Sequence, residues 1–368
     1  MKPPDPVLLI ARELDLGGTE RQLAEMARSL DRDEFEPHTG CFRPGGLRAA
    51  ELEAAGVPVA LFPATSFHGP AALRGARALG EYVRRHNIRL VHTFDVPANV
   101  FAAPVARMFG VPRVISSQRA HRGLTPGILR HLLRLTDQIA DAVVVNCESV
   151  RRELIDEEHV PAGRIHLCYN GVDTDVFRSC PEMRPDGAPV VGIVCALRKE
   201  KDLGTLLGAF AQVRHAHRGV KLLIVGGGPE RERVEALARD LALGDAFHLE
   251  PATNRVAGWL RAIDIFVLPS RSEALSNSLM EAMACGCAVV ASRAGGNPEL
   301  VTEGRTGLLF EPGDRDGLAA ALQTLLANRE QRLRFGAAAA RRMREEFSLT
   351  AAARRMGEIY RAALERVC

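Results

Sequence analysis

The sequence predicts two doubly wound α/β domains, each built on a parallel sheet with helices on both faces. Short apolar runs alternate with amphipathic helical stretches along nearly the whole chain of 368 residues, which is typical of parallel sheets covered by helices. A segment rich in proline and charge, 178–189, interrupts this alternation once and is expected to be a linker. The length is also about right for two domains.

The elements of the first domain follow one another in simple order. Its predicted strands are apolar runs at 7–11, 57–62, 89–94, 113–117, 142–146 and 164–170, with helices expected near 19–30 and 71–86. We assign residues 1–178 to this domain and expect the helix at 348–368 to cross back to it.

The alternation restarts after the linker. The predicted strands are 190–197, 221–228, 246–250, 264–270, 287–292 and 307–311, and helices rich in arginine and alanine follow them. Residues 188–347 form the second predicted domain. Doubly wound domains bind ligands at the carboxyl ends of their strands, so a cleft shared by the two facing domains is the expected site.

Composition excludes several classes of protein. The net charge of +3 requires no polyanionic partner, and nucleic-acid binding is not expected. No segment approaches the roughly 20 apolar residues of a membrane-spanning helix, and the short apolar run near the start is interpreted as a first strand rather than a secretory signal. The eight cysteines include no CxxC pair, which favours reduced core residues in the cytoplasm and no metal site.

Each predicted domain has a glycine-rich loop after one of its early strands, the first strand in the first domain and the second strand in the second domain. Gly17 and Gly18 precede Thr19 at the start of a predicted helix, where backbone N–H groups and the helix dipole could hold a phosphate. The alternative is a tight turn between strand and helix. Gly226 opens a triple-glycine loop at the equivalent place in the second domain. Its pattern lacks the third glycine of a dinucleotide fingerprint, which argues against a nicotinamide dehydrogenase.

The segment SRSEALSNSLMEAMACGCAVVAS contains Glu273 and Glu281, eight residues apart. Within one helix they would lie about 12 Å apart, which disfavours a glycosidase pair at about 5–10 Å. We expect Glu273 in a loop and Glu281 about one turn into a helix that starts near Asn277 or Ser278. The expected pyrophosphate ligands are the loop N–H groups of Ala274, Leu275, Ser276 and Asn277. Carboxylates on either side suit hydroxyl-rich groups, although two solvated glutamates are the alternative.

These residues resemble a known family. DIFVLPSRSEALSNSLMEAMACGCAVVASRAGGNPELVTEGRTGLLFEPGD (264–313) is similar to the nucleotide-sugar segment of the family-four retaining glycosyltransferases, which have the GT-B fold. LGGTERQLAEMARSL, VVVNCESVRREL, YNGVDTDVF and ALRKEKDLGTLLGAF match other segments of that family in the same order. The resemblance covers nearly the whole chain.

The resemblance implies roles for individual residues. Glu281 would bind the donor ribose, Glu273 the transferred sugar and Lys201 the leaving diphosphate. Gly17 and Gly18 would approach the diphosphate or the acceptor, which the first domain would bind. Gly226 is a further candidate for donor binding, and base contacts are expected near 254–256, including Val256. The usual arginine is replaced by Ala196, so Arg198 is the candidate substitute.

A second departure lies in the first domain. A histidine often follows the strand that matches RVISS, and here Arg119 and His121 compete for its place. His121 is the catalytic candidate, and Arg119 is a candidate for binding the donor. The family is retaining, which is usually explained by same-face attack assisted by the leaving phosphate. No cofactor or metal is expected, and Asp173 and Asp175 are interpreted as loop structure. The expected donor is a sugar carried by UDP or GDP.

The expected acceptor is a glycan or lipid-linked hydroxyl, in cell-surface polysaccharide or glycolipid synthesis. No acidic residue occurs between Val96 and Thr136. The basic residues of this stretch are Arg107, Arg113, Arg119, His121, Arg122, Arg130, His131 and Arg134. They are compatible with peripheral contact with an anionic membrane at its cytoplasmic face or with an ordinary arginine-rich helix surface.

Two alternative functions remain open at this stage. A nucleotide-sugar epimerase or a phosphorylase shares the architecture, but the paired glutamates and the lack of an obvious pyridoxal-phosphate lysine argue against them. A non-catalytic nucleotide-sugar-binding protein is kept open by Ala196 at the arginine position.

Overall fold

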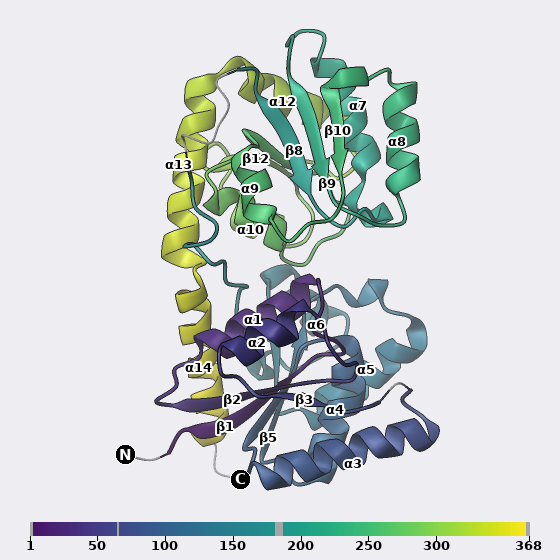
Figure 1. Ribbon diagram of the computed structural model, residues 1–368, viewed down its shortest axis with the longest axis vertical. Helices are drawn as coiled ribbons and strands as arrows, with labels where there is room; N and C mark the ends of the chain where they lie inside the picture. Colours follow the sequence, from purple (N-terminus) through teal and green to yellow (C-terminus); the bar gives the residue numbers. More distant parts are fainter. Residues whose placement is uncertain (1–2, 65, 181–186, 366–368) are drawn as a thin grey trace. The chain divides into compact units, whose positions relative to one another are not determined.

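A computed structural model describes residues 3–64, 66–180 and 187–365. It divides into two compact units. Unit 1 comprises Met1–Gly171 with Leu349–Cys368, and unit 2 comprises Val172–Ser348. Each unit is a parallel sheet flanked by helices (Figure 1), which confirms the predicted doubly wound α/β class. Half of the linker predicted at 178–189, residues 181–186, lies outside the described residues.

Within the described residues, unit 1 has a seven-stranded parallel sheet in the order β3-β2-β1-β4-β5-β6-β7. The strands are β1 (Asp5–Ile10), β2 (Phe35–Cys41), β3 (Val59–Leu61), β4 (Leu90–Thr93), β5 (Arg113–Gln118), β6 (Ala142–Val145) and β7 (Ile165–Leu167). The helices are α1 (Gly18–Ser29), α2 (Leu47–Ala54), α3 (Gly69–Arg85), α4 (Val96–Met108), α5 (Gly127–Ile139), α6 (Glu148–Asp156) and α14 (Leu349–Glu365), with short 3₁₀ turns at Arg122–Leu124 and Ala162–Arg164.

Strand β2 was not predicted. Its sequence, FEPHTGC, contains a proline, a histidine and a glycine and carries no apolar run. It nevertheless pairs in parallel with β1 over Phe35–Gly40 and with β3 on its other side. The strand is formed because its neighbours bury it, although Pro37 contributes no N–H group to the ladder.

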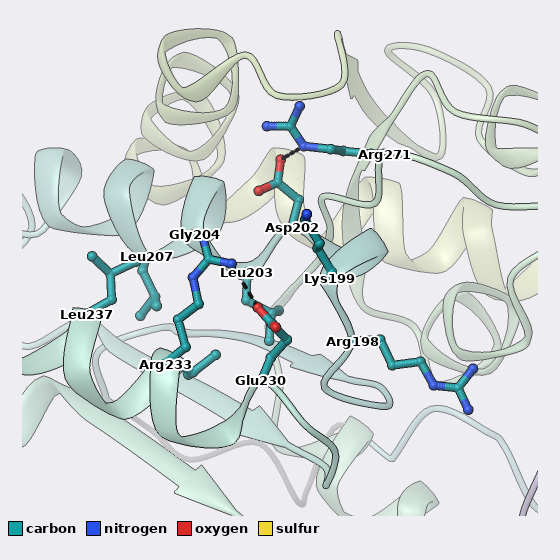
Figure 2. Close-up of a pocket in the computed structure, with 11 residues that line it drawn as sticks. Arg198, Lys199, Asp202, Leu203, Gly204, Leu207, Glu230, Arg233, Leu237 and Arg271 are labelled. Atoms are coloured by element: carbon teal, nitrogen blue, oxygen red, sulfur yellow. Dashed lines mark hydrogen bonds and ion pairs between the residues drawn. The ribbon is translucent and has the colours of Figure 1, made fainter. Parts of the chain in front are cut away.

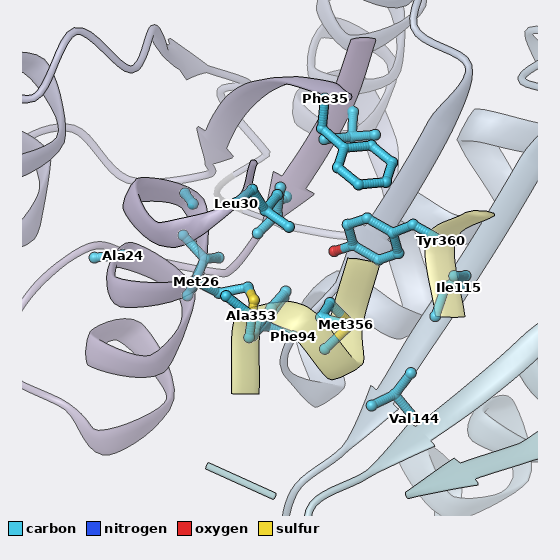
Figure 3. Packing of buried hydrophobic residues seen from close by; sticks show 14 of the residues in the cluster. Ala24, Met26, Leu30, Phe35, Phe94, Ile115, Val144, Ala353, Met356 and Tyr360 are labelled. Carbon is cyan, nitrogen blue, oxygen red and sulfur yellow. The ribbon is translucent and has the colours of Figure 1, made fainter. Parts of the chain in front are cut away.

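The C-terminal helix α14 belongs to unit 1. Tyr360 on this helix is fully buried and packs edge-on against Phe35, with ring centroids 5.7 Å apart. Met356 and Ala353 lie one and two turns before it and join the cluster formed by α1 and the sheet (Figure 3). Beneath them, His92 on β4 contacts the Tyr360 hydroxyl through Nδ1 at 2.7 Å and Ser117 Oγ through Nε2 at 2.8 Å.

In the described part of unit 2, a six-stranded parallel sheet has the order β10-β9-β8-β11-β12-β13. The strands are β8 (Val190–Val194), β9 (Lys221–Val225), β10 (Phe247–Glu250), β11 (Ile265–Leu268), β12 (Ala288–Ser292) and β13 (Gly307–Phe310). The helices are α7 (Leu203–Val213), α8 (Arg231–Asp240), α9 (Val256–Arg261), α10 (Asn277–Ala284), α11 (Asn297–Leu300), α12 (Arg315–Ala327) and α13 (Arg329–Glu346), with 3₁₀ turns at Lys199–Lys201 and Gly244–Ala246. Every strand predicted from the sequence overlaps one of the observed strands.

The strand orders locate a point of reversal in each sheet. In unit 1 the chain runs outward from β1 in one direction and restarts at β4 on its other side; in unit 2 the same happens at β8 and β11. Open parallel sheets bind ligands at the carboxyl ends of the strands that flank such a reversal. The loops that follow β8 and β11 are therefore the first place to look for a site in unit 2.

Candidate functional site

Lys201 and Glu273 meet at the reversal point of unit 2. Lys201 ends the 3₁₀ turn after β8, and Glu273 lies in the loop after β11. The ammonium group of Lys201 donates a hydrogen bond to Glu273 Oε1, which also accepts one from Ser270 Oγ at 3.1 Å. Their side chains are only 17% and 12% exposed. A cation and a hydroxyl-accepting carboxylate are thus brought together, as a sugar–diphosphate site needs.

The two loops are also joined by contacts beside this pair. The Arg271 backbone N–H donates to the carbonyl of Glu200 at 2.8 Å. The guanidinium of Arg271 forms an ion pair with Asp202 at 2.8 Å, and Thr205 donates a hydroxyl bond to the same carboxylate. Asp202 has a left-handed backbone conformation, with φ at 46°. These contacts fix the loop that carries Glu273 against the turn that carries Lys201.

Helix α10 begins at Asn277, which confirms the predicted start. Ser276 caps it by accepting a hydrogen bond from the Leu279 N–H at 3.3 Å. Glu281 lies one turn into the helix and is buried, with 5% of its surface exposed. Buried glutamates are uncommon and are paired or functional. Ala274 and Leu275, just before the cap, are buried as well.

The loop of Glu273 is supported from below by a glycine pair after β12. Gly295 has φ at +52°, and a Cβ there would lie 1.6 Å from the Glu273 carbonyl oxygen. The next N–H, of Gly296, donates to the Ala274 carbonyl at 2.7 Å. Only glycine permits this approach of two backbones. Gly295 is therefore a candidate residue that the sequence reasoning missed, and its signal was the GG dipeptide directly after a strand.

The triple-glycine loop has a packing role that is plain in the structure. A Cβ on Gly226 would lie 1.9 Å from the Cys195 carbonyl oxygen, and one on Gly228 would lie 2.5 Å from that of Leu197. The Leu197 N–H donates to the Gly227 carbonyl at 2.9 Å. The loop after β9 therefore packs on the segment that leads to Lys201. The role of Gly226 in donor binding stays a prediction.

A cavity of about 260 Å³ opens beside this site, between α7 and α8 (Figure 2). It is lined by Arg198, Lys199, Asp202, Leu203, Gly204, Leu207, Glu230, Arg233, Val234, Leu237 and Arg271. Of the predicted donor residues only Arg198 lines it; Lys201, Glu273 and Glu281 do not. Arg198 is exposed, and its guanidinium extends away from Arg233 and Arg271 (Figure 2). Its proposed substitution for the arginine at Ala196 is untested by this geometry.

In unit 1 the glycine loop after β1 already holds a carboxylate. Gly17 is the N-cap of α1 and Gly18 its first residue, as expected for a helix N-terminus. A Cβ on Gly17 would lie 1.9 Å from Glu20 Oε2, so the Glu20 side chain folds back over the turn. Burial raises the pKa of Glu20. A phosphate bound here would have to displace this carboxylate, a competitor that the sequence reasoning did not weigh.

A second carboxylate, Asp95, lies at the reversal point of unit 1. It follows β4 and accepts hydrogen bonds from the Arg12 N–H at 2.7 Å and the Ala98 N–H at 2.8 Å. Burial raises the pKa of Asp95 to about 6, despite these bonds. It caps α4 and ties the loop after β1 to the loop after β4. The signal in the sequence was an aspartate directly before the VPAN helix start.

Arg119 and His121, which competed for one predicted role, have different partners. Arg119 Nη2 donates to Asn170 Oδ1 at 2.5 Å, and its guanidinium lies 5.5 Å from the Phe94 ring centroid. His121 Nδ1 lies 2.7 Å from Glu153 Oε2, while its Nε2 is 3.4 Å from Ser149 Oγ. The structure therefore gives each side chain its own surroundings, and both roles stay predictions.

Glu153, which the sequence reasoning missed, fixes the His121 loop. Its Oε1 accepts the Arg122 N–H at 2.8 Å, and its side chain is 9% exposed. Burial favours the neutral acid, but hydrogen bonds from His121 and the backbone outweigh it, so the pKa of Glu153 is lowered. An ionised carboxylate at Nδ1 orients the ring and directs Nε2 the other way.

The basic stretch of unit 1 is largely paired. Arg130 and Arg134 on α5 both bind Glu158, at 2.5 and 2.7 Å, and the buried Arg122 binds Asp137 at 2.7 Å. The apolar side chains of Ile128 and Leu135 on the same helix are 71% and 54% exposed. The exposed face of α5 is therefore less basic and more apolar than its sequence indicates.

Asp173 has the loop role that was predicted for it. Its Oδ1 accepts hydrogen bonds from the N–H groups of Asp175 and Val176, at 3.0 and 3.1 Å. In the described ranges, no group of three or more His, Cys, Asp or Glu side chains is placed to hold a metal ion. No described helix is both long and apolar enough to span a membrane.

Comparison with known families places both halves of the chain. Residues 181–342 match the model of the glycosyl transferases group 1, and residues 16–176 match that of glycosyltransferase family 4. The GDP-mannose-dependent α-(1-6)-phosphatidylinositol monomannoside mannosyltransferase of Mycobacterium tuberculosis is 31% identical over 307 residues, covering 77% of this chain and 78% of that one. The sulfoquinovosyl transferase SQD2 of Arabidopsis thaliana is 30% identical over 77% of this chain and 58% of its own length.

Solved structures share the fold at lower identity. The Anabaena protein HepE, in complex with UDP and glucose, has a TM-score of 0.84 with 22% identity, covering 97% of this chain and 99% of that chain. A sucrose-phosphate synthase from Thermosynechococcus elongatus also has a TM-score of 0.84, with 22% identity over 97% and 98%. With the family matches, these likenesses confirm the resemblance drawn from the sequence. The chain belongs to glycosyltransferase family 4 and is a glycosyltransferase of the GT-B type.

Proposed function

We propose that this glycosyltransferase moves a hexose from a nucleoside-diphosphate sugar to a hydroxyl of a glycan or lipid-linked acceptor, with retention at the anomeric carbon. The observation that carries the proposal is the Lys201–Glu273 pair at the reversal point of unit 2, with buried Glu281 one turn into the adjoining helix. Cell-surface polysaccharide or glycolipid synthesis is the corresponding pathway class.

Each residue has a chemical task in this proposal. Breaking a sugar–diphosphate bond develops negative charge on the leaving phosphate, which Lys201 and the N-terminus of α10 would stabilise. Glu281 would accept hydrogen bonds from the ribose hydroxyls, and Glu273 from those of the sugar. Burial raises the pKa of the nearby Cys195 to about 12, so this thiol stays protonated and is a poor nucleophile. Same-face attack assisted by the leaving phosphate fits these residues.

Two similar proteins suggest the nucleotide that carries the donor sugar. The mycobacterial relative is named as GDP-mannose-dependent, and HepE was solved with UDP and with UDP-glucose. We therefore propose UDP or GDP as the carrier and no bound cofactor. The base would lie near Val256, at the start of α9, where backbone groups can form the contacts.

The test is a calorimetric panel of UDP, GDP, ADP and their sugar conjugates. We expect one nucleotide to bind wild type and to bind Glu281→Ala and Glu281→Gln at least about tenfold more weakly, because a charge-assisted hydrogen bond is lost. Glu311→Gln is the matched control, since that side chain is 70% exposed. If no nucleotide binds wild type, the donor assignment fails.

Turnover separates a transferase from a binding protein. Slow release of free sugar from the bound donor, followed by proton NMR at the first time points, would give the anomer formed and test retention. Donor binding without any cleavage or transfer would favour the non-catalytic alternative, which Ala196 keeps open.

Contact with an anionic membrane is a separate part of the proposal. Ile128 and Leu135 expose apolar surface on α5 beside Arg134 and His131, a combination suited to a lipid interface at the cytoplasmic face. Flotation with anionic vesicles should recover the wild type and lose the Ile128→Glu/Leu135→Glu double variant. Absence of wild-type flotation at low salt would exclude this contact.

A further inference from the structure

Arg119 is a partly buried cation that has no ion-pair partner among the described residues. Within the described residues, its polar and aromatic partners are Asn170 Oδ1 and the Phe94 ring, and no carboxylate forms an ion pair with it. A guanidinium carries five N–H donors, of which the Asn170 bond uses one. A fully buried nitrogen atom of Arg119 without a hydrogen-bond partner would be an unsatisfied buried atom, and none of its nitrogen atoms is one. Solvent can therefore reach the nitrogen atoms that Asn170 does not bind.

Among the described residues, the buried Arg122 and Arg332 each have more polar contacts than Arg119. Arg122, which is 1% exposed, pairs with Asp137 at 2.7 Å and lies 3.7 Å from Glu158. Arg332 donates to the carbonyls of Leu325 and Leu326 at 2.6 and 3.0 Å. Arg119 differs, and burial lowers its pKa to about 10. Taking a charge out of water without a counter-charge destabilises a fold, so an uncompensated charge of this kind indicates a ligand site.

Its position in the fold supports the same conclusion. Arg119 directly follows β5, at the carboxyl edge of the unit 1 sheet. Phe94 follows the neighbouring strand β4, and Asn170 lies after β7. Loops at this edge form the ligand crevice of doubly wound domains. Beside Arg119, Asn146 follows the strand residue Val145 that pairs with Gln118, and its buried Oδ1 has no hydrogen-bond partner in the described part of the chain.

We propose that Arg119 anchors a phosphate or carboxylate group of the acceptor, which makes the acceptor an anionic, hydroxylated molecule. The inference rests on the proposed transferase function and adds the chemical class of its acceptor. A guanidinium binds phosphate oxygens through two parallel N–H bonds. The donor diphosphate is the other possible source of the same chemistry. Lys201 is already assigned to the donor in unit 2, which favours the acceptor for Arg119.

The first experiment measures stability without ligand. If Arg119 serves a ligand, Arg119→Met should unfold at the same or a higher urea concentration than wild type, because a costly unpaired charge is removed. Arg122→Met should unfold at a clearly lower concentration, because it leaves Asp137 buried without its cation. If Arg119→Met is destabilised as much as Arg122→Met, Arg119 is a structural residue and the proposal is overturned.

The second experiment uses inorganic phosphate as the probe, titrated at low salt and followed by ³¹P line broadening. Wild type should bind phosphate, and the affinity of Arg119→Met for phosphate should be at least about tenfold lower. Arg84→Met is the matched control, since Arg84 also lies on a phenylalanine ring, 4.9 Å from the Phe109 centroid, and is exposed. It should bind phosphate as wild type does. Equal binding by all three proteins, or none by wild type, overturns the proposal.

A third arm separates the two sources of phosphate. The titration is repeated with the nucleotide that binds in the donor panel present at saturation. Phosphate binding that persists supports an acceptor site, while competition by the nucleotide assigns Arg119 to the donor and overturns the acceptor assignment. If no nucleotide binds at all, the donor assignment fails, and the first two experiments still decide whether Arg119 is an anion site.

Discussion

Lys201 and Glu273 are hydrogen-bonded to each other across 72 positions of sequence. Lys201 was predicted to bind the leaving phosphate and Glu273 the sugar. Without a donor, the ammonium group of Lys201 is therefore bonded to the carboxylate that would bind the sugar. An arriving diphosphate would compete with Glu273 for the ammonium group and free the carboxylate for hydroxyl groups. In the proposed mechanism, the pair would therefore couple the diphosphate and sugar parts of the donor.

A double-mutant cycle tests this pair. Lys201→Met and Glu273→Gln should each lower the free energy of unfolding by about 1–3 kcal/mol, because each leaves a largely buried partner uncompensated. The double variant should lose less than the sum, with a coupling of about 1 kcal/mol or more. Urea unfolding followed through Trp259, which lies on α9 of unit 2, gives all four values. Additive losses would show that the two side chains do not interact.

Gly295 should be intolerant of any side chain. Gly295→Ala places a Cβ against the Glu273 carbonyl oxygen, so we expect both a stability loss and weaker nucleotide binding as the loop moves. Gly304→Ala is the control, since Gly304 also has a positive φ, +71°, but nothing lies within 4 Å of its Cβ position. The control should lose only about 1–2 kcal/mol and bind nucleotide normally. Equal effects at both sites would show that backbone strain alone matters.

Glu153 should give unit 1 a dependence on acid. Its pKa is lowered in the folded state from 4.5, so its stabilising contribution is present above pH 4.5 and is lost as the pH falls through the lower folded value. Glu153→Gln should flatten this part of the stability curve, followed by near-ultraviolet circular dichroism of the tyrosines. Glu157→Gln, at a side chain 64% exposed, should not.

The same substitution also tests how His121 acts. Without the Glu153 carboxylate the ring loses the partner that orients Nε2, so Glu153→Gln should lower kcat and shift the pH profile of activity if His121 contacts substrate. An unchanged pH profile with lower stability would limit Glu153 to a structural role.

His92 should loosen the C-terminal helix in acid. Burial lowers its pKa to about 3 from 6.5, so between these values the unfolded chain binds a proton that the folded chain does not. Stability should therefore fall progressively as the pH drops from 6.5 toward 3. His92→Asn should be less stable at pH 7 but nearly independent of pH in this window. The Trp259 signal of unit 2 serves as the internal control, and a pH slope unchanged in the variant would remove His92 as the cause.

Patterns local in sequence predicted much of the fold. The apolar runs located most strands, and the serine-rich loop before a short apolar helix located the start of α10 near Asn277 or Ser278. Strand β2 escaped because its burial comes from β1 and β3 rather than from its own composition. The helix that carries Glu281 was predictable because its signal lies in its own sequence, whereas the signal for β2 lies in the neighbouring strands.

Contacts between distant segments could not be predicted in this way. The Lys201–Glu273 pair depends on β8 and β11 being neighbours, which the sheet order alone decides. The occupation of the Gly17 turn depends on the rotamer of Glu20, and the separation of Arg119 from His121 depends on Asn170 and Glu153. In each case the partner lies on another element or is chosen by side-chain packing.

The placement of α14 has a consequence for synthesis on the ribosome. Unit 2 is contained within Val172–Ser348, whereas unit 1 needs both the first segment and the helix at Leu349–Glu365. A nascent chain can therefore complete unit 2 while unit 1 still exposes the groove that Met356 and Tyr360 will fill. Translation that stops after Ser348 would release a finished unit 2 tethered to a unit 1 whose apolar surface lacks α14, a natural substrate for chaperones.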